Sequence, residues 1–159
     1  MDAIALLKED HQKAKKLMTE LEETTERGVK TREEKWTKLL KELTIHENIE
    51  EEIFYPALHE TDDKELKDIV LEALEEHHLV DDIVEQLKDT PFDDEHWAAK
   101  FKVTKENVEH HIEEEETDMF KLVRKNVSAT ELEELGSRME ASKAEQMKET
   151  MPERDQVEL

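Results

Sequence analysis

Two stretches of the chain repeat one pair of metal-binding residue types, His46-x-x-x-Glu50 and His111-x-x-x-Glu115. On an α-helix, residues four apart differ by about 40° around the axis and about 6 Å along it, so both side chains reach one point. An imidazole nitrogen and a carboxylate oxygen aimed at the same point are suitable ligands for a metal ion. Each stretch therefore predicts half of a metal site.

Each stretch also has a partner histidine upstream, within an apolar stripe of helical spacing. His11 lies between Leu7 and Ala14, and His77 lies between Leu74 and Val80. A lone histidine on such a stripe is usually a core residue, but two carboxylates on inward stripes are costly to bury without compensation. Four helices that each supply nitrogen or oxygen ligands are what a dinuclear centre in a helix bundle requires. We therefore favour a metal centre over a purely structural polar network.

The doublets His77-His78 and His110-His111 leave the register to be decided. Apolar residues follow His11 and His77 at the same offsets, and the His-x-x-x-Glu-Glu pairs match in the same frame. This repeat of about 66 residues selects His77 and His111, because neighbours differ by about 100° around a helix. His78 and His110 are then expected on the side of the bundle, and His59 and His96 outside ligand reach.

The composition predicts an all-α protein. Only two glycines and three prolines interrupt 159 residues. Helices are expected over about 2–27, from a capping box at 31–34 to about 56, from 61 or 62 to 90, from 93 or 94 to 126, and over 128–151. Short turns make the first four antiparallel, an up-down-up-down four-helix bundle spanning 1–127. The short C-terminal helix, 128–151, is expected to pack on or extend from the bundle, and 152–159 to be a flexible tail.

The formal net charge of −22 constrains the partners. Nucleic acid and anionic membranes repel such a surface, so neither is expected to bind. The chain has no cysteine, which excludes thiolate ligands and disulfides. No apolar run approaches a membrane span and the acidic N-terminus is unlike a signal peptide, so we expect a cytoplasmic protein. The sequence does not identify a protein partner.

The ligand types narrow the metal. Imidazole with carboxylate and no sulfur suits iron, manganese, zinc or copper. Two carboxylates can bridge two ions while histidines bind at each end, an arrangement that favours two non-haem irons; manganese and zinc stay open.

These residues are the ones by which the chain resembles the hemerythrin-like, or HHE cation-binding, family. The matching motifs span about 1–126: Asp10-His11, His46-x-x-x-Glu50-Glu51 with Tyr55-Pro56, Glu76-His77, and His111-x-x-x-Glu115-Glu116 with Phe120. The resemblance implies a di-iron centre in a four-helix bundle, with Glu50 and Glu115 bridging. It also implies four terminal ligands: His11, His46, His77 and His111.

The chain departs from the oxygen-carrying hemerythrins at two positions. Those proteins have a second histidine one turn before His77, where this chain has Ala73, and an aspartate five residues past the fourth histidine, where it has Glu116. One iron would therefore lack a protein ligand. Glu47 resembles a carboxylate ligand at that position in the hemerythrin-like domain of an iron-sensing ubiquitin-ligase subunit, and water is the simpler alternative. Reversible oxygen carriage is thus less favoured than the metal site itself.

The expected function is binding of, or reaction with, a small ligand: oxygen, peroxide or nitric oxide. If the protein is an enzyme, the resemblance implies peroxide disproportionation or nitric oxide handling at the di-iron pair, with an open coordination position. The alternative is an iron- or oxygen-sensing or metal-storage module without turnover. A sensor usually carries an output domain, which this sequence does not show.

Overall fold

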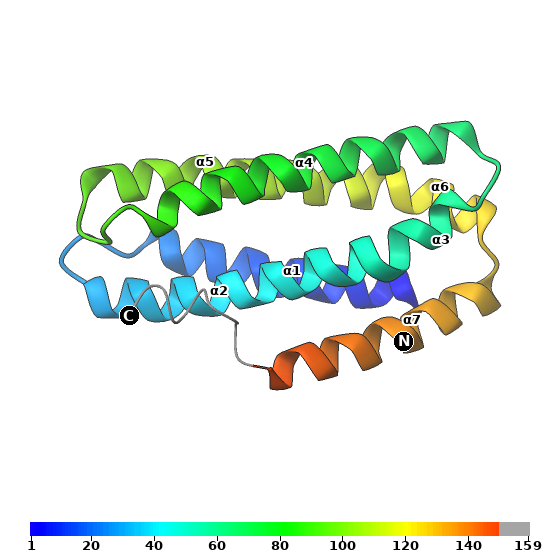
Figure 1. The fold of residues 1–159 in the computed structure, drawn as a ribbon, viewed down its shortest axis with the longest axis horizontal. Helices are drawn as coiled ribbons and strands as arrows, with labels where there is room; N and C mark the ends of the chain where they lie inside the picture. The colour runs from blue at the N-terminus through cyan, green and yellow to red at the C-terminus, as the bar shows by residue number, and fades with distance from the viewer. Residues whose placement is uncertain (150–159) are drawn as a thin grey trace.

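The computed structural model describes residues 1–149, which form an antiparallel four-helix bundle with a further helix beside it (Figure 1). Two of the bundle helices are α1 (Ala3–Glu22) and α4 (Lys64–Lys88). The other two are composite: α2 (Val29–Ile49), η1 (Glu50–Phe54) and α3 (Tyr55–His59) follow one another, as do α5 (Glu95–Glu114), η2 (Glu115–Met119) and α6 (Phe120–Asn126). This architecture confirms the predicted all-α bundle.

Short polar side chains begin most of these helices. Asp2, Asp63, Asp94 and Ser128 each accept a hydrogen bond from a backbone N–H in the first turn of the helix that follows. Such caps satisfy donors that have no partner within the helix. The caps at Asp2, Asp94 and Ser128 were expected from the sequence, whereas the third long helix begins at Lys64, slightly later than predicted.

The predicted boundaries around Gly28 were wrong. The first helix ends at Glu22 rather than near residue 27, and the next begins at Val29, so the supposed capping box at 31–34 lies inside a helix. The reason is Arg32, whose buried guanidinium donates to the carbonyls of Thr24 and Phe92. These hydrogen bonds join two loops at one end of the bundle, and the chain leaves the first helix early to make them.

Helix α7 (Ala129–Lys148) lies along α1 and α2 (Figure 1). Its apolar residues Leu132, Leu135 and Met139 join a core cluster that also contains Ile4 and Leu7 of α1. The sequence prediction extended this helix to 151; its last two residues and the expected flexible tail, 152–159, lie outside the described residues.

The core consists of two apolar clusters separated by a polar layer. Phe54, Leu66 and Val123 lie in the cluster near the N-terminus of α1, and Trp36, Trp97 and Phe101 lie in the other. The four histidines singled out in the sequence are buried near the middle of the bundle, between the two clusters. Apolar packing on both sides therefore holds a polar layer in place.

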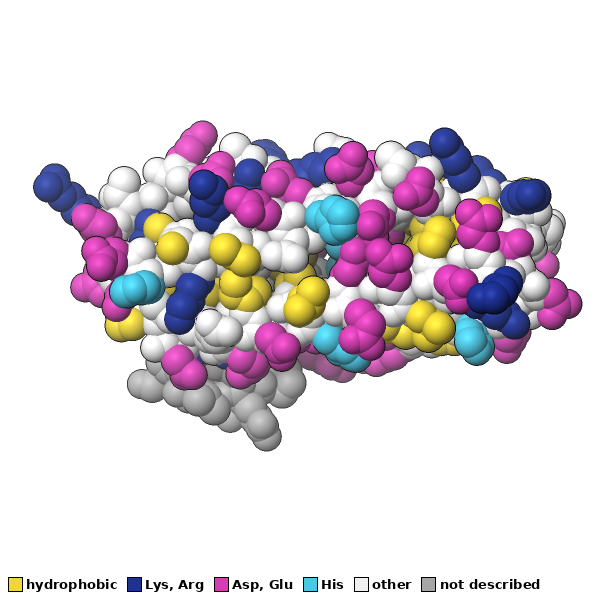
Figure 2. Space-filling view, turned by 90° about the horizontal axis from the view of Figure 1, so that it is seen from above, with side chains coloured by type: hydrophobic (Ala, Val, Ile, Leu, Met, Phe, Trp, Pro, Cys, Tyr) yellow, Lys and Arg dark blue, Asp and Glu magenta, His cyan; other side chains and the backbone are white. Residues whose placement is uncertain are grey.

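The outer surface is acidic. Carboxylate side chains are prominent on the face formed by α4 and α5, with scattered lysines, arginines and histidines among them (Figure 2). Among the helices of residues 1–149, none combines the length and apolarity that crossing a bilayer needs.

Close contact between α7 and the N-terminus generates a first prediction. A Cβ atom at Gly136 would lie 2.1 Å from the backbone oxygen of Met1, whereas one at Gly28 would meet only a backbone oxygen at 3.8 Å. Gly136→Ala must shift backbone, so it should lower the free energy of unfolding by about 1–3 kcal/mol in urea denaturation. Gly28→Ala is the control and should cost less than about 1 kcal/mol. Equal effects of the two variants would contradict this packing.

Candidate metal centre

The structure brings the six principal candidate ligands into two adjoining clusters in the polar layer. One contains His11, His46 and Glu115, and the other contains Glu50, His77 and His111; in each, the potential ligand atoms lie within 4.8 Å of one another. All six side chains are buried. Each cluster draws residues from both halves of the sequence repeat.

The two carboxylates lie between the clusters. Glu115 Oε1 is 3.0 Å from His11 Nε2, and its other oxygen is 3.3 Å from His111 Nε2. Glu50 Oε1 is 3.3 Å from His46 Nε2 and 3.1 Å from His77 Nε2. Each carboxylate thus contacts a histidine of both clusters, which is the position a bridging ligand needs.

Each histidine of the centre also contacts a second carboxylate through Nδ1, the ring nitrogen that faces away from the two clusters. The Nδ1 atoms of His11, His46, His77 and His111 pair with Glu116 (2.6 Å), Asp10 (3.0 Å), Glu51 (2.7 Å) and Glu76 (2.8 Å), respectively. A carboxylate accepting from Nδ1–H fixes the tautomer and directs the Nε2 lone pair toward a metal. This arrangement is typical of metal-bound histidines.

These four supporting carboxylates were not assigned a role from the sequence. Each directly precedes or follows a candidate ligand, as Asp10 precedes His11 and Glu51 follows Glu50, but each supports a histidine on a different helix. The signal was present in the doublets Asp-His, Glu-His and Glu-Glu. The doublets do not show how the helices pack, and the packing decides which histidine each carboxylate contacts.

Two buried atoms of the centre have no hydrogen-bond partner among residues 1–149, His46 Nε2 and Glu50 Oε2. Both belong to the candidate ligand set. An unsatisfied buried polar atom is costly, and such atoms call for a partner beyond the protein chain. The histidine and carboxylate donors, together with these two atoms, fit hard or borderline cations.

The electrostatics of the metal-free centre favour positive charge. Burial by itself lowers the pKa of His77, but the Glu50 carboxylate outweighs it and raises that pKa to about 9. Burial also opposes charge on His46 and His111, yet adjacent carboxylates, chiefly Glu50 for His46 and Glu115 for His111, raise both pKa values well above 6.5. The carboxylates therefore hold protons on these three histidines, and cations that bind there must displace those protons.

Both bridging candidates begin a π-helical segment. Glu50 opens η1 and Glu115 opens η2. Pro56 follows the first segment but no proline follows the second, so proline is not their shared cause. What they share is a Glu-Glu pair whose first member lies at the centre and whose second supports a histidine. Single π-helical turns are frequent at functional sites, and here one occurs in each half of the repeat.

Equivalent aromatic positions break the symmetry of the centre. The Tyr55 ring packs on His77 and Phe120 stacks on His11. The Tyr55 hydroxyl donates to Glu115 Oε2 at 2.5 Å. Burial, together with the charges of Glu115 and Glu50, raises the pKa of Tyr55 well above 10, so the hydroxyl keeps its proton. Phe120 offers no such donor to Glu50.

The remaining candidates lie outside the two clusters. Glu47 is 3.9 Å from His77 Nδ1 and groups with Glu51 and His77, on the side of the ring opposite Nε2. His78 and His110 are 64% and 62% exposed, and His59 and His96 are also at the surface. The structure does not place Glu47 in either buried cluster, and its role as a ligand stays a prediction.

A small cavity adjoins the centre. It has a volume of about 40 Å³, and its lining combines all four histidines and several carboxylate residues with the apolar side chains of Ala14, Leu43, Val80, Val108 and Ile112. A space of this size holds one or a few molecules as small as water. The space beside the centre is therefore suited to a small ligand.

With this fold and ligand arrangement, the chain belongs to the hemerythrin HHE cation binding domain family, whose sequence model matches residues 2–123. It is a metal-binding, hemerythrin-like protein by family and by its histidine and glutamate clusters. The chain is similar to a hemerythrin HHE cation binding domain-containing protein, an Rv2633c homolog from Mycobacterium kansasii. That crystal structure shares 31% identity and a TM-score of 0.81, with 92% of this chain and 87% of the other covered.

A second similar protein is a DNA nickase from a Nostoc species. It is 26% identical over 143 residues, which cover 87% of this chain. The chain spans only 38% of the length of that relative.

The raised pKa values predict how the metal-free protein responds to pH. For His77 the folded value is about 9 against 6.5 unperturbed, so its stabilising contribution is complete below pH 6.5 and is lost as pH rises through 9. Burial, with the nearby charge of Asp81, raises the pKa of Glu47 to about 8, so the folded state again binds more protons and stability falls with rising pH. Loss of protons from His77 and Glu47 therefore lowers the free energy of unfolding as the pH rises from 6.5 to 9.

Urea denaturation of chelator-treated protein tests this dependence. The midpoint should be lower at pH 9 than at pH 6.5, and His77→Gln should reduce the difference. A midpoint that is constant or higher at pH 9 would contradict the charge arrangement.

Proposed function

We propose that the protein binds two non-haem iron ions and uses them to bind or react with oxygen, peroxide or nitric oxide. His11 and His46 would hold one ion, His77 and His111 the other, and Glu50 and Glu115 would bridge them. The observation that carries the proposal is the set of four imidazoles, each fixed at Nδ1 by a carboxylate, with every Nε2 near a carboxylate shared between the clusters. The absence of sulfur ligands and the bridging positions favour iron over softer metals.

An iron pair, when bound, supplies Lewis acidity and the capacity to exchange electrons with a small oxidant. The protein supplies the rest. The supporting carboxylates hold the imidazoles in one orientation, and the adjoining cavity of about 40 Å³ has room for a small molecule. Tyr55 holds a proton on its hydroxyl at the edge of the centre, where it donates to Glu115.

The position of Tyr55 favours peroxide or oxygen chemistry over storage alone. Reduction of an oxygen–oxygen bond consumes protons, and a general acid within hydrogen-bond reach accelerates such a step. Tyr55 carries a proton at the edge of the centre, since burial and the charges of Glu115 and Glu50 raise its pKa. A metal store would need no such group.

Nickase activity is not carried over from the Nostoc relative. More than half of that protein lies beyond the matched region, and a net charge of −22 is repelled by nucleic acid phosphates. We propose a small-molecule ligand and no nucleic-acid partner.

Anaerobic reconstitution with ferrous iron tests the proposal. The chain should bind two irons, develop near-ultraviolet oxo-bridge absorption on exposure to air, and consume added peroxide. Uptake of one iron or none under these conditions would refute the dinuclear assignment. Two stably bound irons that react with neither oxygen, peroxide nor nitric oxide would favour the storage alternative.

Substitution of the two bridging candidates tests which residues bind the metal ions. Glu50→Ala and Glu115→Ala each remove a carboxylate shared by both clusters, so both variants should lose dinuclear binding by elemental analysis. His78→Ala and His110→Ala are matched controls at exposed neighbouring positions and should keep two irons per chain. Loss of iron from the histidine controls, or full retention in the glutamate variants, would contradict the ligand assignment.

A further inference from the structure

Helix α7 reaches the candidate centre through one side chain, Lys143. Its ammonium donates to Asp10 Oδ1, and the other oxygen of Asp10 accepts from His46 Nδ1 at 3.0 Å. Asp10 is 6% exposed and the Lys143 side chain 19% exposed, so solvent screens this ion pair only partly. Lys143 lies beyond residues 2–123, the part of the chain matched by the family.

No equivalent cation supports the other three histidines. Within residues 1–149, neither Glu51 nor Glu116 has a lysine or arginine nitrogen within 4.0 Å. Glu76 has the exposed imidazole of His110 at 3.6 Å, which carries charge only when protonated. Asp10 is therefore the supporting carboxylate whose negative charge is shared with a permanent cation.

The ion pair between Lys143 and Asp10 should change the affinity of the centre for a cation in one direction. A carboxylate that accepts from Nδ1–H makes the imidazole a stronger metal ligand. An ammonium on the same carboxylate withdraws part of this effect, and its own positive charge repels a cation bound at the Nε2 side of His46. Both contributions weaken cation binding at the half of the centre that contains His46.

We propose that Lys143 acts through Asp10 as a positioning residue that makes the two metal half-sites inequivalent. It lowers the affinity of the His11–His46 half for a divalent cation relative to the His77–His111 half. This inference rests on the proposed dinuclear function, and it gives α7 a role beyond packing. In a two-ion centre, inequivalent halves fill in order and can take different roles.

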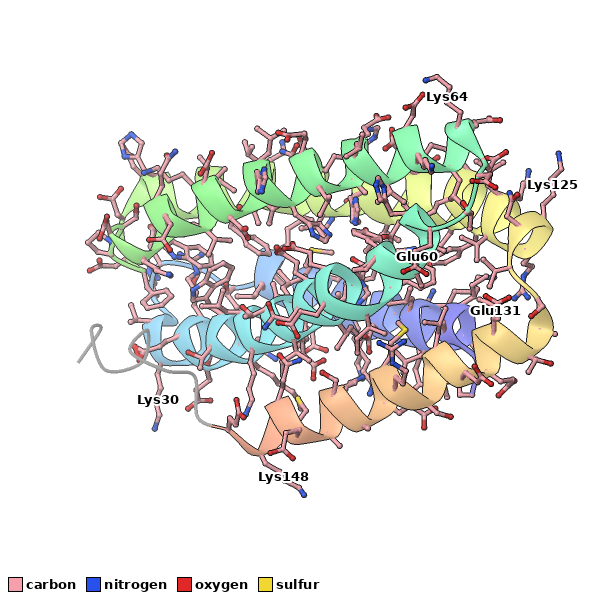
Figure 3. All side chains as sticks on the ribbon, turned by 45° about the vertical axis from the view of Figure 1, so that its right-hand side comes forward. Lys30, Glu60, Lys64, Lys125, Glu131 and Lys148 are labelled. Carbon is pink, nitrogen blue, oxygen red and sulfur yellow. The ribbon has the colours of Figure 1, made fainter. Side chains whose placement is uncertain are left out.

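The test is an anaerobic calorimetric titration of the metal-free chain with ferrous iron. The titration resolves the two stepwise binding constants. Lys143→Met removes the charge and keeps most of the side-chain stem, with Lys143→Gln as a second neutral variant. Lys143→Arg restores a cation at that position. Lys148→Met is the control, because Lys148 points away from the bundle near the end of the same helix (Figure 3).

Lys143→Met should strengthen one binding step by about tenfold and leave the other within about twofold, since changes around metal ligands shift affinity by about 10- to 100-fold. Lys143→Arg and Lys148→Met should bind as the wild type does. The strengthened step should persist in a His77→Gln background and disappear in a His46→Gln background, which assigns it to the His46 half.

Two failures can be told apart. If the wild type takes up fewer than two irons, the proposed function fails and this inference falls with it. If the wild type binds two irons but Lys143→Met and Lys143→Gln bind them unchanged or more weakly, only the role of Lys143 is overturned. Weaker binding in these variants would mean that the lysine merely anchors α7.

Discussion

The structure depends on the burial of two carboxylates, Glu50 and Glu115, in the middle of a helix bundle. A buried carboxylate without compensation is strongly destabilising, so positive charge must be placed beside it. In the metal-free chain, protonated histidines provide that charge, which is why the pKa values of His46, His77 and His111 are raised. Bound cations would be a more complete solution, because they would also give partners to His46 Nε2 and Glu50 Oε2, which have no hydrogen-bond partner within residues 1–149. The bundle is thus built around a buried site suited to cations.

The centre inherits near two-fold symmetry from the sequence repeat, and its departures from symmetry indicate function. Tyr55 donates a hydrogen bond to Glu115, whereas Phe120, in the equivalent position of the other half, has no hydroxyl group. Lys143 pairs with Asp10, the carboxylate that supports His46, whereas the equivalent Glu76, which supports His111, has the exposed imidazole of His110 beside it in place of a lysine. The two ions of a bound pair would therefore have different surroundings.

Much of this site could be predicted from the sequence, because its ligands lie on apolar stripes of helical spacing. The same spacing distinguishes His77 from His78 and His111 from His110. The supporting carboxylates could not be assigned, because each supports a histidine of another helix, and cross-helix contacts depend on packing rather than on periodicity. The early end of the first helix escaped prediction for the same reason: Arg32 bonds carbonyls of two loops, including that of Phe92, 60 residues away in the sequence.

A crystal structure of the iron-reconstituted protein, with anomalous difference maps at the iron absorption edge, tests the central claim most directly. The account predicts two iron peaks per chain, one among His11, His46 and Glu115 and the other among Glu50, His77 and His111. Both glutamates should contact both ions. A single peak, or peaks at an exposed group such as Glu76, His110 and Glu114, would contradict the account.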